Sequence, residues 1–326
     1  MRVASRWSGS IVTMLMVSVF AATAALLTGS GAPAHAAPSP VAACAPRAAA
    51  PANTVHTTTV EGVTRTYRVH LPAGYTGRTP MPLILAFPGH TESPTTFERY
   101  TGLSALPAVV VYPDGLRGTD GTLSWQGAPY SSPQADDIAF TAAILREVRA
   151  TSCVDRTRTY AVGRSNGGGL VSMLACRMPG QFAAYAIVNG AFYDQSLRGC
   201  SASKAPASII DFHGTADATI HYGGGTRLGG HYAPIFDVVR SWAARNGCIP
   251  TPLEVPVNSA VTQFLWPLCR SVGSEISHYR IAGGAHVWPG SSVHRGRTGV
   301  SDSISATTLI WQFFNRHPLT VGGRSR

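Results

Sequence analysis

YAVGRSNGGGL, residues 160–170, joins a short apolar run to a cluster of glycines. The spacing Gly163-x-Ser165-x-Gly167 is typical of a tight turn between a strand and a helix that exposes a serine hydroxyl. Because the chain contains 34 glycines, the same spacing also fits a flexible loop. The residues on either side of the turn have to decide between these two interpretations.

Short apolar runs alternate with helical patterns along the chain. Strands buried on both faces are predicted over residues 82–87, 108–113, 159–163, 185–190 and 208–214. An alternating pattern predicts an antiparallel hairpin over residues 57–71, and the last strand is expected at residues 276–284. Helices are predicted over residues 136–148, 167–178, 235–244 and 303–314. This order predicts an α/β fold with a mostly parallel central sheet and helices on both faces, which puts Ser165 between a buried strand and a helix.

A nucleophilic serine needs a base within hydrogen-bond reach and a carboxylate that orients the base. Asp217 and His286 each follow a predicted strand, and both come after Ser165 in the chain. Serine, acid and histidine occur in this order in α/β-hydrolases, and an open α/β sheet places its site at the carboxyl ends of its strands. We therefore expect Ser165, Asp217 and His286 to form a catalytic triad.

Other acids and histidines compete for these roles. Asp211 lies inside an apolar strand, where a structural role is expected, and His213 is expected to pack or to hydrogen-bond near Asp217. His294 and Asp302 lie further along, in a polar loop. The order and spacing of the triad residues favour Asp217 and His286.

Two backbone N–H groups are expected to bind the oxyanion of the tetrahedral intermediate that a nucleophilic serine would form. One belongs to Asn166 at the start of the helix, and the other to His90 in the loop after residues 82–87. Gly89 would let the backbone approach closely; alternatively, Pro88-Gly89 only turns the chain.

The first 36 residues have a charged, apolar and then small-residue order, which predicts a cleaved secretory signal peptide rather than an uncleaved membrane anchor. An Ala/Pro-rich leader is expected at 37–54, a catalytic domain at 55–320 and a short tail at 321–326. Six cysteines in an exported chain suggest disulfides. Although the sequence alone leaves the pairing open, we expect Cys44–Cys153, Cys176–Cys200 and Cys248–Cys269.

The net charge of +10 could indicate a nucleic acid or an anionic surface as partner. The basic residues are nearly all arginines and are scattered singly, so we expect no nucleic-acid partner. No cysteine or histidine spacing matches a metal site, and neither a metal nor a cofactor is expected. After removal of the signal peptide we expect no membrane association, and we expect a monomer.

Six stretches resemble the extracellular esterase family that groups polyhydroxybutyrate depolymerases with feruloyl and acetylxylan esterases. They are PLILAFPGHTES, VVVYPDG with Trp125 shortly after, CVDRTRTYAVGRSNGGGLVSMLACRMPGQFAAYAIVNGAF, DFHGTADATIHY, SWAARNGC and GGAHVWPG, all within residues 65–318. The resemblance implies an α/β-hydrolase fold, a serine esterase mechanism without metal, and the same triad. This sequence departs from the family in one place, because Pro88 stands where the family usually has histidine. The sequence gives no reason for Arg164 beside the serine.

These features predict a secreted serine carboxylesterase acting on feruloyl-type esters of plant cell-wall polysaccharide. Polyester depolymerase and acetylxylan esterase are the alternatives, and a binding protein without catalysis is an alternative of another class. Trp125 and Trp288 could line an aromatic-binding cleft, or could simply pack in the core. Because His286 must be neutral to act as the base, we expect activity to fall as the pH drops through about 6.5.

Overall fold

The computed structural model describes residue 44 and residues 52–200, 205–271, 273–293 and 302–319. The predicted signal peptide, most of the leader and the tail lie outside these residues. The elements along the chain are β1 Asn53–Val60, β2 Val63–His70, β3 Met81–Phe87, α1 Pro94–Thr101, η1 Leu103–Ala105, β4 Val109–Pro113, β5 Leu116–Arg117, β6 Leu123–Ser124, α2 Asp137–Thr151, β7 Val154–Arg164, α3 Asn166–Arg177, β8 Ala184–Val188, α4 Asp194–Leu197, β9 Ser208–Gly214, β10 Gly225–Arg227, β11 Gly230–Tyr232, α5 Ile235–Arg245, β12 Leu253–Pro256, β13 Val261–Trp266, β14 Ile276–Ile281 and α6 Ala306–Arg316.

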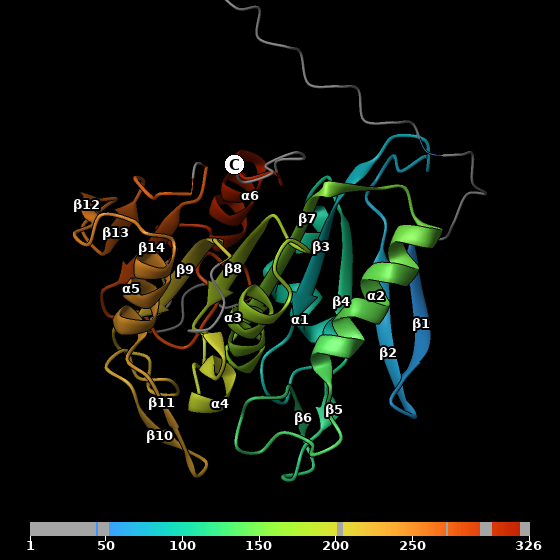
Figure 1. Cartoon of the computed structure of the whole chain (residues 1–326), viewed down its shortest axis with the longest axis horizontal. Helices are drawn as coiled ribbons and strands as arrows, with labels where there is room; N and C mark the ends of the chain where they lie inside the picture. The colour runs from blue at the N-terminus through green and yellow to red at the C-terminus, as the bar shows by residue number, and fades with distance from the viewer. Residues whose placement is uncertain (1–43, 45–51, 201–204, 272, 294–301, 320–326) are drawn as a thin grey trace, which may run out of the picture. The chain divides into compact units, whose positions relative to one another are not determined.

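The described strands form a ten-stranded sheet in the order β1-β2-β4-β3-β7-β8-β9-β14-β13-β12 (Figure 1). The six central strands from β4 to β14 run parallel to one another. The β1–β2 hairpin at one edge and the β13–β12 pair at the other are antiparallel. The predicted α/β fold with a mostly parallel central sheet is confirmed.

Side chains of the central strands alternate between two cores, one on each face of the sheet. In β3, Leu83, Leu85 and Phe87 pack with residues of α2, α3 and α5, whereas Ile84 and Ala86 pack with residues of α1 and α6. Strands covered on both faces must be apolar at every position, and β3 is buried at every residue after its first. The continuous apolar runs in the sequence have this physical origin.

Several boundaries and elements differ from the sequence prediction. The opening hairpin begins at Asn53, before the predicted start of the domain at residue 55, because eight residue pairs join β1 to β2. β14 is the last strand of the chain but not the edge of the sheet, since β13 and β12 extend beyond it. The prediction omitted both strands. Every residue of β12 is exposed, so this strand lacks the apolar signature of the central ones.

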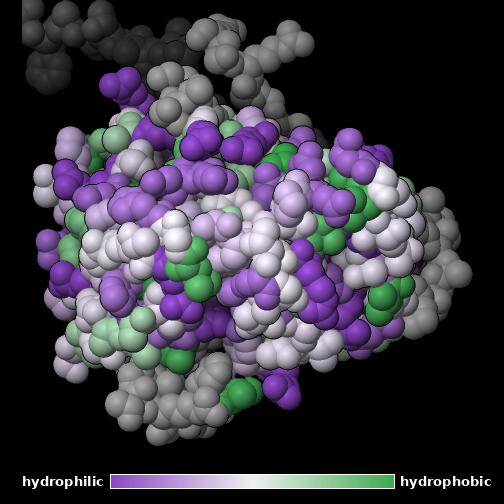
Figure 2. Space-filling model, turned by 90° about the horizontal axis from the view of Figure 1, so that it is seen from below, coloured by the Kyte–Doolittle hydropathy of each residue, from purple (hydrophilic) through white to green (hydrophobic). Residues whose placement is uncertain are grey.

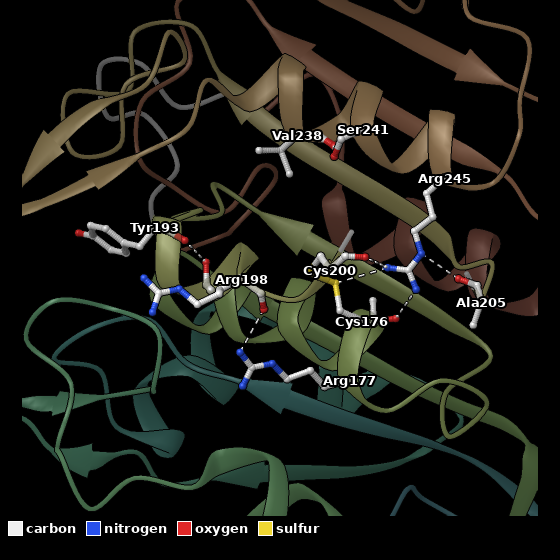
Figure 3. The surroundings of a disulfide bond; sticks show 11 residues. Cys176, Arg177, Tyr193, Arg198, Cys200, Ala205, Val238, Ser241 and Arg245 are labelled. Carbon is white, nitrogen blue, oxygen red and sulfur yellow. Dashed lines mark hydrogen bonds between the residues drawn. A yellow bond between two sulfur atoms is a disulfide. The ribbon is translucent and has the colours of Figure 1, made fainter. Parts of the chain in front are cut away.

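Three disulfides join the expected pairs: Cys44–Cys153, Cys176–Cys200 and Cys248–Cys269. Figure 3 shows the second of these at the end of α3, with Arg245 of α5 lying against it. The Arg245 guanidinium lies 3.5 Å from Cys176 Sγ and donates to the carbonyl of Ala205 at 2.9 Å. This disulfide and Arg245 therefore hold the chain after α4 against the C-terminal ends of α3 and α5.

Candidate active site

Four neighbouring parallel strands each deliver one polar side chain to the same edge of the sheet. Ser165 follows β7, Asn189 follows β8, Asp217 follows β9 and His286 follows β14, and these strands are adjacent in that order. The connections to β5–β6 and to β10–β11 lie at the lower end of the molecule in Figure 1. Figure 2, seen from below, shows that the described part of this face is mostly hydrophilic, with hydrophobic residues in small separate patches.

The turn at Ser165 has the geometry of a strained elbow. Ser165 has φ 54° and ψ −121°, a backbone conformation that is rare for a residue with a side chain. A Cβ at Gly163 would lie 2.3 Å from the carbonyl oxygen of Gly167, and a Cβ at Gly167 would lie 2.3 Å from the backbone oxygens of Phe87 and Pro88. Both glycines are therefore required by close backbone approach. The flexible-loop interpretation of this motif is excluded.

Asp217 and His286 form a short hydrogen bond. Asp217 Oδ2 lies 2.6 Å from His286 Nδ1, and the carboxylate is fully buried. An ionised carboxylate can only accept hydrogen bonds, so Nδ1 of His286 carries the proton. Nε2 of the neutral ring is then left with a lone pair that can accept a proton.

Further groups fix the Asp217 carboxylate in place. Oδ1 accepts hydrogen bonds from the backbone N–H groups of Thr219 and Ile220, each at 2.8 Å. Oδ2 accepts from the Asn189 side-chain amide at 3.0 Å and lies 3.3 Å from His213 Nε2. The position expected for His213, close to Asp217, is confirmed. Asn189 was not predicted, although it too is a polar residue directly after a buried strand.

These contacts move the pKa of both groups. Burial alone would raise the pKa of Asp217, but hydrogen bonds from His213 and His286 outweigh burial and hold that pKa well below its ordinary value. Burial and, to a smaller extent, the positive charge of Arg164 lower the pKa of His286, whereas the hydrogen bond to Asp217 raises it, and the net pKa is about 4. The neutral form of His286 therefore extends to more acidic conditions than the ordinary histidine pKa implies.

Arg164, the last residue of β7, joins the histidine loop to the strand that precedes Ser165. Its Nη2 donates to the backbone carbonyl of His286 at 2.5 Å. Within the described residues, however, Ser165 Oγ makes no hydrogen bond with His286. Hydrogen bonds between catalytic groups are often long or absent before substrate binds, and what joins the histidine loop to the serine turn here is the contact of Arg164 with the His286 backbone.

The loop after β3 passes directly beside Ser165. A Cβ at Gly89 would lie 3.4 Å from the Ser165 Cβ. Neither the His90 nor the Asn166 backbone N–H donates a hydrogen bond to another described residue. The Asn166 side chain accepts from the Trp125 backbone N–H at 2.7 Å, which fixes the start of α3. Asn166 thus begins the helix directly after the elbow, and Gly89, the residue before His90, lies against Ser165.

Neither predicted substrate-binding tryptophan presents its ring to a ligand. Trp125 and Trp288 are each 1% exposed. The Trp125 Nε1 donates to the Pro88 carbonyl at 2.8 Å, and Trp288 packs edge-on against Phe97. These contacts are those of core packing, and the Trp125 ring supports the loop after β3 that lies beside Ser165.

The competing residues have other surroundings. Asp211 is buried in β9 and accepts a 2.6 Å hydrogen bond from His278 of β14. This pair joins two strands of the sheet, as expected for a structural aspartate. Asp302 is exposed, and His294 lies outside the described residues. Across the described ranges, no cluster of three or more histidine, cysteine or acidic side chains is arranged to hold a metal ion.

Solved structures with a similar chain path define the fold. An acetyl xylan esterase from Aspergillus awamori aligns with 81% of this chain and 99% of its own, at a TM-score of 0.59 and 12% identity. An S-formylglutathione hydrolase from Agrobacterium tumefaciens aligns with 85% of this chain and 100% of its own, at a TM-score of 0.53 and 14% identity. The chain has the α/β-hydrolase fold, and no helix among the described residues is long and apolar enough to cross a membrane.

Sequence similarity narrows the class to carboxylic-ester hydrolases. Residues 65–214 match the protein-family model described as esterase PHB depolymerase. Feruloyl esterase B of Piromyces equi is 30% identical over 229 residues, which are 67% of this chain and 42% of that protein. Feruloyl esterase D of Neurospora crassa is 27% identical over 308 residues, which are 89% of this chain and 95% of that protein. The expected resemblance to the family of these esterases is confirmed, although the chain spans less than half the length of the Piromyces relative.

Proposed function

We propose that this protein is a secreted serine carboxylesterase that releases feruloyl-type acyl groups from plant cell-wall polysaccharide. The observation that carries the proposal is the buried 2.6 Å hydrogen bond between Asp217 and His286 at the sheet edge where the strained Ser165 turn lies. The three disulfides support export, because disulfides persist in oxidising compartments.

The reaction would proceed in two halves. In the first, His286 Nε2 takes the proton of Ser165 as the serine oxygen attacks the ester carbonyl carbon. The backbone N–H groups of His90 and Asn166 would bind the resulting oxyanion. When the tetrahedral intermediate collapses, the bond to the alcohol oxygen breaks and the alcohol leaves with the proton from His286. The acyl group remains on Ser165.

In the second half, water replaces the alcohol. His286 takes a proton from the water as it attacks the acyl carbon, and a second tetrahedral intermediate forms. Its collapse returns the proton to the Ser165 oxygen and releases the carboxylic acid. Asp217 holds the imidazole in one tautomer and stabilises the imidazolium in both halves.

The choice of acyl group follows the relatives that are named feruloyl esterases. The hydrophilic character of the described face in Figure 2 also favours a soluble or oligosaccharide ester over the apolar surface of a solid polyester. Polyester depolymerase and acetylxylan esterase activity are the alternatives, and assays on 3-hydroxybutyrate oligomers and acetylated xylan test them.

The test is chromatographic release of ferulate from methyl ferulate by the protein, with Ser165→Ala as the matched variant. Release by the first protein and not by the second is the expected result. If neither protein releases ferulate, then 3-hydroxybutyrate oligomers and acetylated xylan are assayed next. Failure on all three, together with retention of an anionic glycan at physiological salt, would replace the esterase proposal with that of a binding protein.

A further inference from the structure

Arg164, the last residue of β7, lies between two loops that come from distant parts of the chain. Its side chain is 11% exposed, its Nη1 forms an ion pair with Glu92, and its Nη2 donates to the His286 carbonyl at 2.5 Å. Glu92 belongs to the loop after β3, and His286 to the loop after β14. One guanidinium therefore contacts the loops on both sides of the serine that follows it.

Glu92 extends this connection to the backbone beside Ser165. Its second carboxylate oxygen accepts the backbone N–H of Gly89 at 2.8 Å and the hydroxyl of Tyr100 at 2.7 Å. Hydrogen bonds to an ionised acceptor are among the stronger ones in proteins. They fix Gly89 directly before His90, whose N–H is one of the two proposed oxyanion donors.

We propose that Glu92 and Arg164 are positioning residues, and that together they lock the oxyanion loop and the histidine loop to the strand that carries Ser165. This inference rests on the proposed function. We name the pair the Glu92–Arg164 bridge.

The geometry favours arginine over lysine at this position. Nη1 and Nη2 of one planar group reach two acceptors on different loops, and an ammonium group on a flexible stem is poorly suited to hold both acceptors in one fixed geometry. The pair is mostly buried, with side chains 11% and 16% exposed. Removing one partner would leave the other charge buried without compensation. Loss of either residue should therefore disrupt the contacts of both.

The bridge also places a permanent positive charge near the proposed base. The charged or titratable groups that act on His286 are Asp217, which favours the imidazolium, and Arg164 and His213, which disfavour it. Replacing Arg164 with a neutral side chain should therefore raise the pKa of His286. A residue that only filled space at this position would have no such effect.

The experiment compares the protein with Arg164→Met, Arg164→Lys and Glu92→Gln, using kcat, KM and the pH dependence of kcat/KM on the ester that the protein turns over. Arg164→Met is expected to lower kcat about 100-fold, the scale reported for small misplacements of catalytic groups. The acidic limb of its kcat/KM profile against pH should move to higher pH. Arg164→Lys keeps the charge, so its kcat should fall while the limb stays in place. Glu92→Gln should lower kcat about tenfold.

Arg158→Met is the matched control. Arg158 lies in the first half of β7 and pairs with Asp155 at 2.8 Å, so the substitution removes an arginine–carboxylate pair from the same strand. It should leave kcat and the limb unchanged. Wild-type values for Arg164→Met would overturn the proposal. So would a loss of kcat with an unmoved limb and a melting temperature that falls in proportion, because a structural role alone explains that result.

A second readout separates this proposal from the proposed function. The rate at which a fluorophosphonate probe labels Ser165, followed by mass spectrometry, depends on the oxyanion loop and on His286 but requires no particular substrate. If the protein hydrolyses none of the tested esters yet labels at least tenfold faster than Arg164→Met, the bridge is supported and the substrate assignment fails. Equal labelling rates would overturn the bridge.

Discussion

The buried position of His286 makes the pH dependence of activity a sharp test of the site. Only the neutral imidazole can take the Ser165 proton, and burial lowers the pKa of His286 to about 4. For a group with a pKa of about 4, about nine tenths is neutral at pH 5, whereas an ordinary histidine with a pKa of about 6.5 is only about 3% neutral there. Relative to pH 7, kcat/KM at pH 5 should remain near about 0.9, rather than fall to about 0.04.

The assay is the initial rate of ester hydrolysis at low substrate from pH 3.5 to 8, at constant ionic strength. Each sample is returned to pH 7 and assayed again, so that loss of the fold is separated from protonation of the base. A midpoint near pH 6.5 with full recovery would show that His286 is solvated or is not the base, and would refute the reasoning. The sequence alone predicted that midpoint, and the structure replaces it because only 14% of the His286 side chain is exposed.

Four other changes test the site and the fold. Asp217→Asn should lower kcat by a factor on the order of 10⁴, by analogy with the protease triad, with an unchanged circular dichroism spectrum. Asn189→Ala should lower kcat about tenfold, because the amide holds the carboxylate at 3.0 Å. Gly167→Ala should cost more than about 3 kcal/mol in urea unfolding, since its Cβ would meet two backbone oxygens at 2.3 Å, whereas Gly223→Ala has open space and should be neutral. Cys44→Ser should lower the free energy of unfolding by about 2–5 kcal/mol.

The sequence predicted the central sheet because burial on both faces leaves a local signature. Strands β3, β4, β8 and β9 are continuous apolar runs, and each was located within one or two residues. The same logic placed Ser165, Asp217 and His286, since polar residues that directly follow buried strands meet at one edge of the sheet. The order of the strands and of the residues that follow them was enough to predict that Asp217 and His286 lie close together.

Other features depend on contacts that no local pattern reports. β12 is exposed and short, and its strand character comes from pairing with β13. Helix α1 did carry a local signal, because Ser93 caps it and Pro94 begins it, but its eight residues are too short for clear periodicity. The function of Arg164 could not be predicted, because its partners lie 72 residues before it and 122 residues after it.

Ser165, Asn189, Asp217 and His286 follow four neighbouring strands, and this arrangement has a consequence for the order in which the molecule folds. The third member of the proposed triad lies beyond β14, which must insert between β9 and β13 before the histidine reaches the acid. A chain that has assembled only its first parallel strands would hold the serine elbow but no base. Ester turnover would then require the completed sheet. During refolding, the recovery of activity should therefore lag behind the recovery of secondary structure.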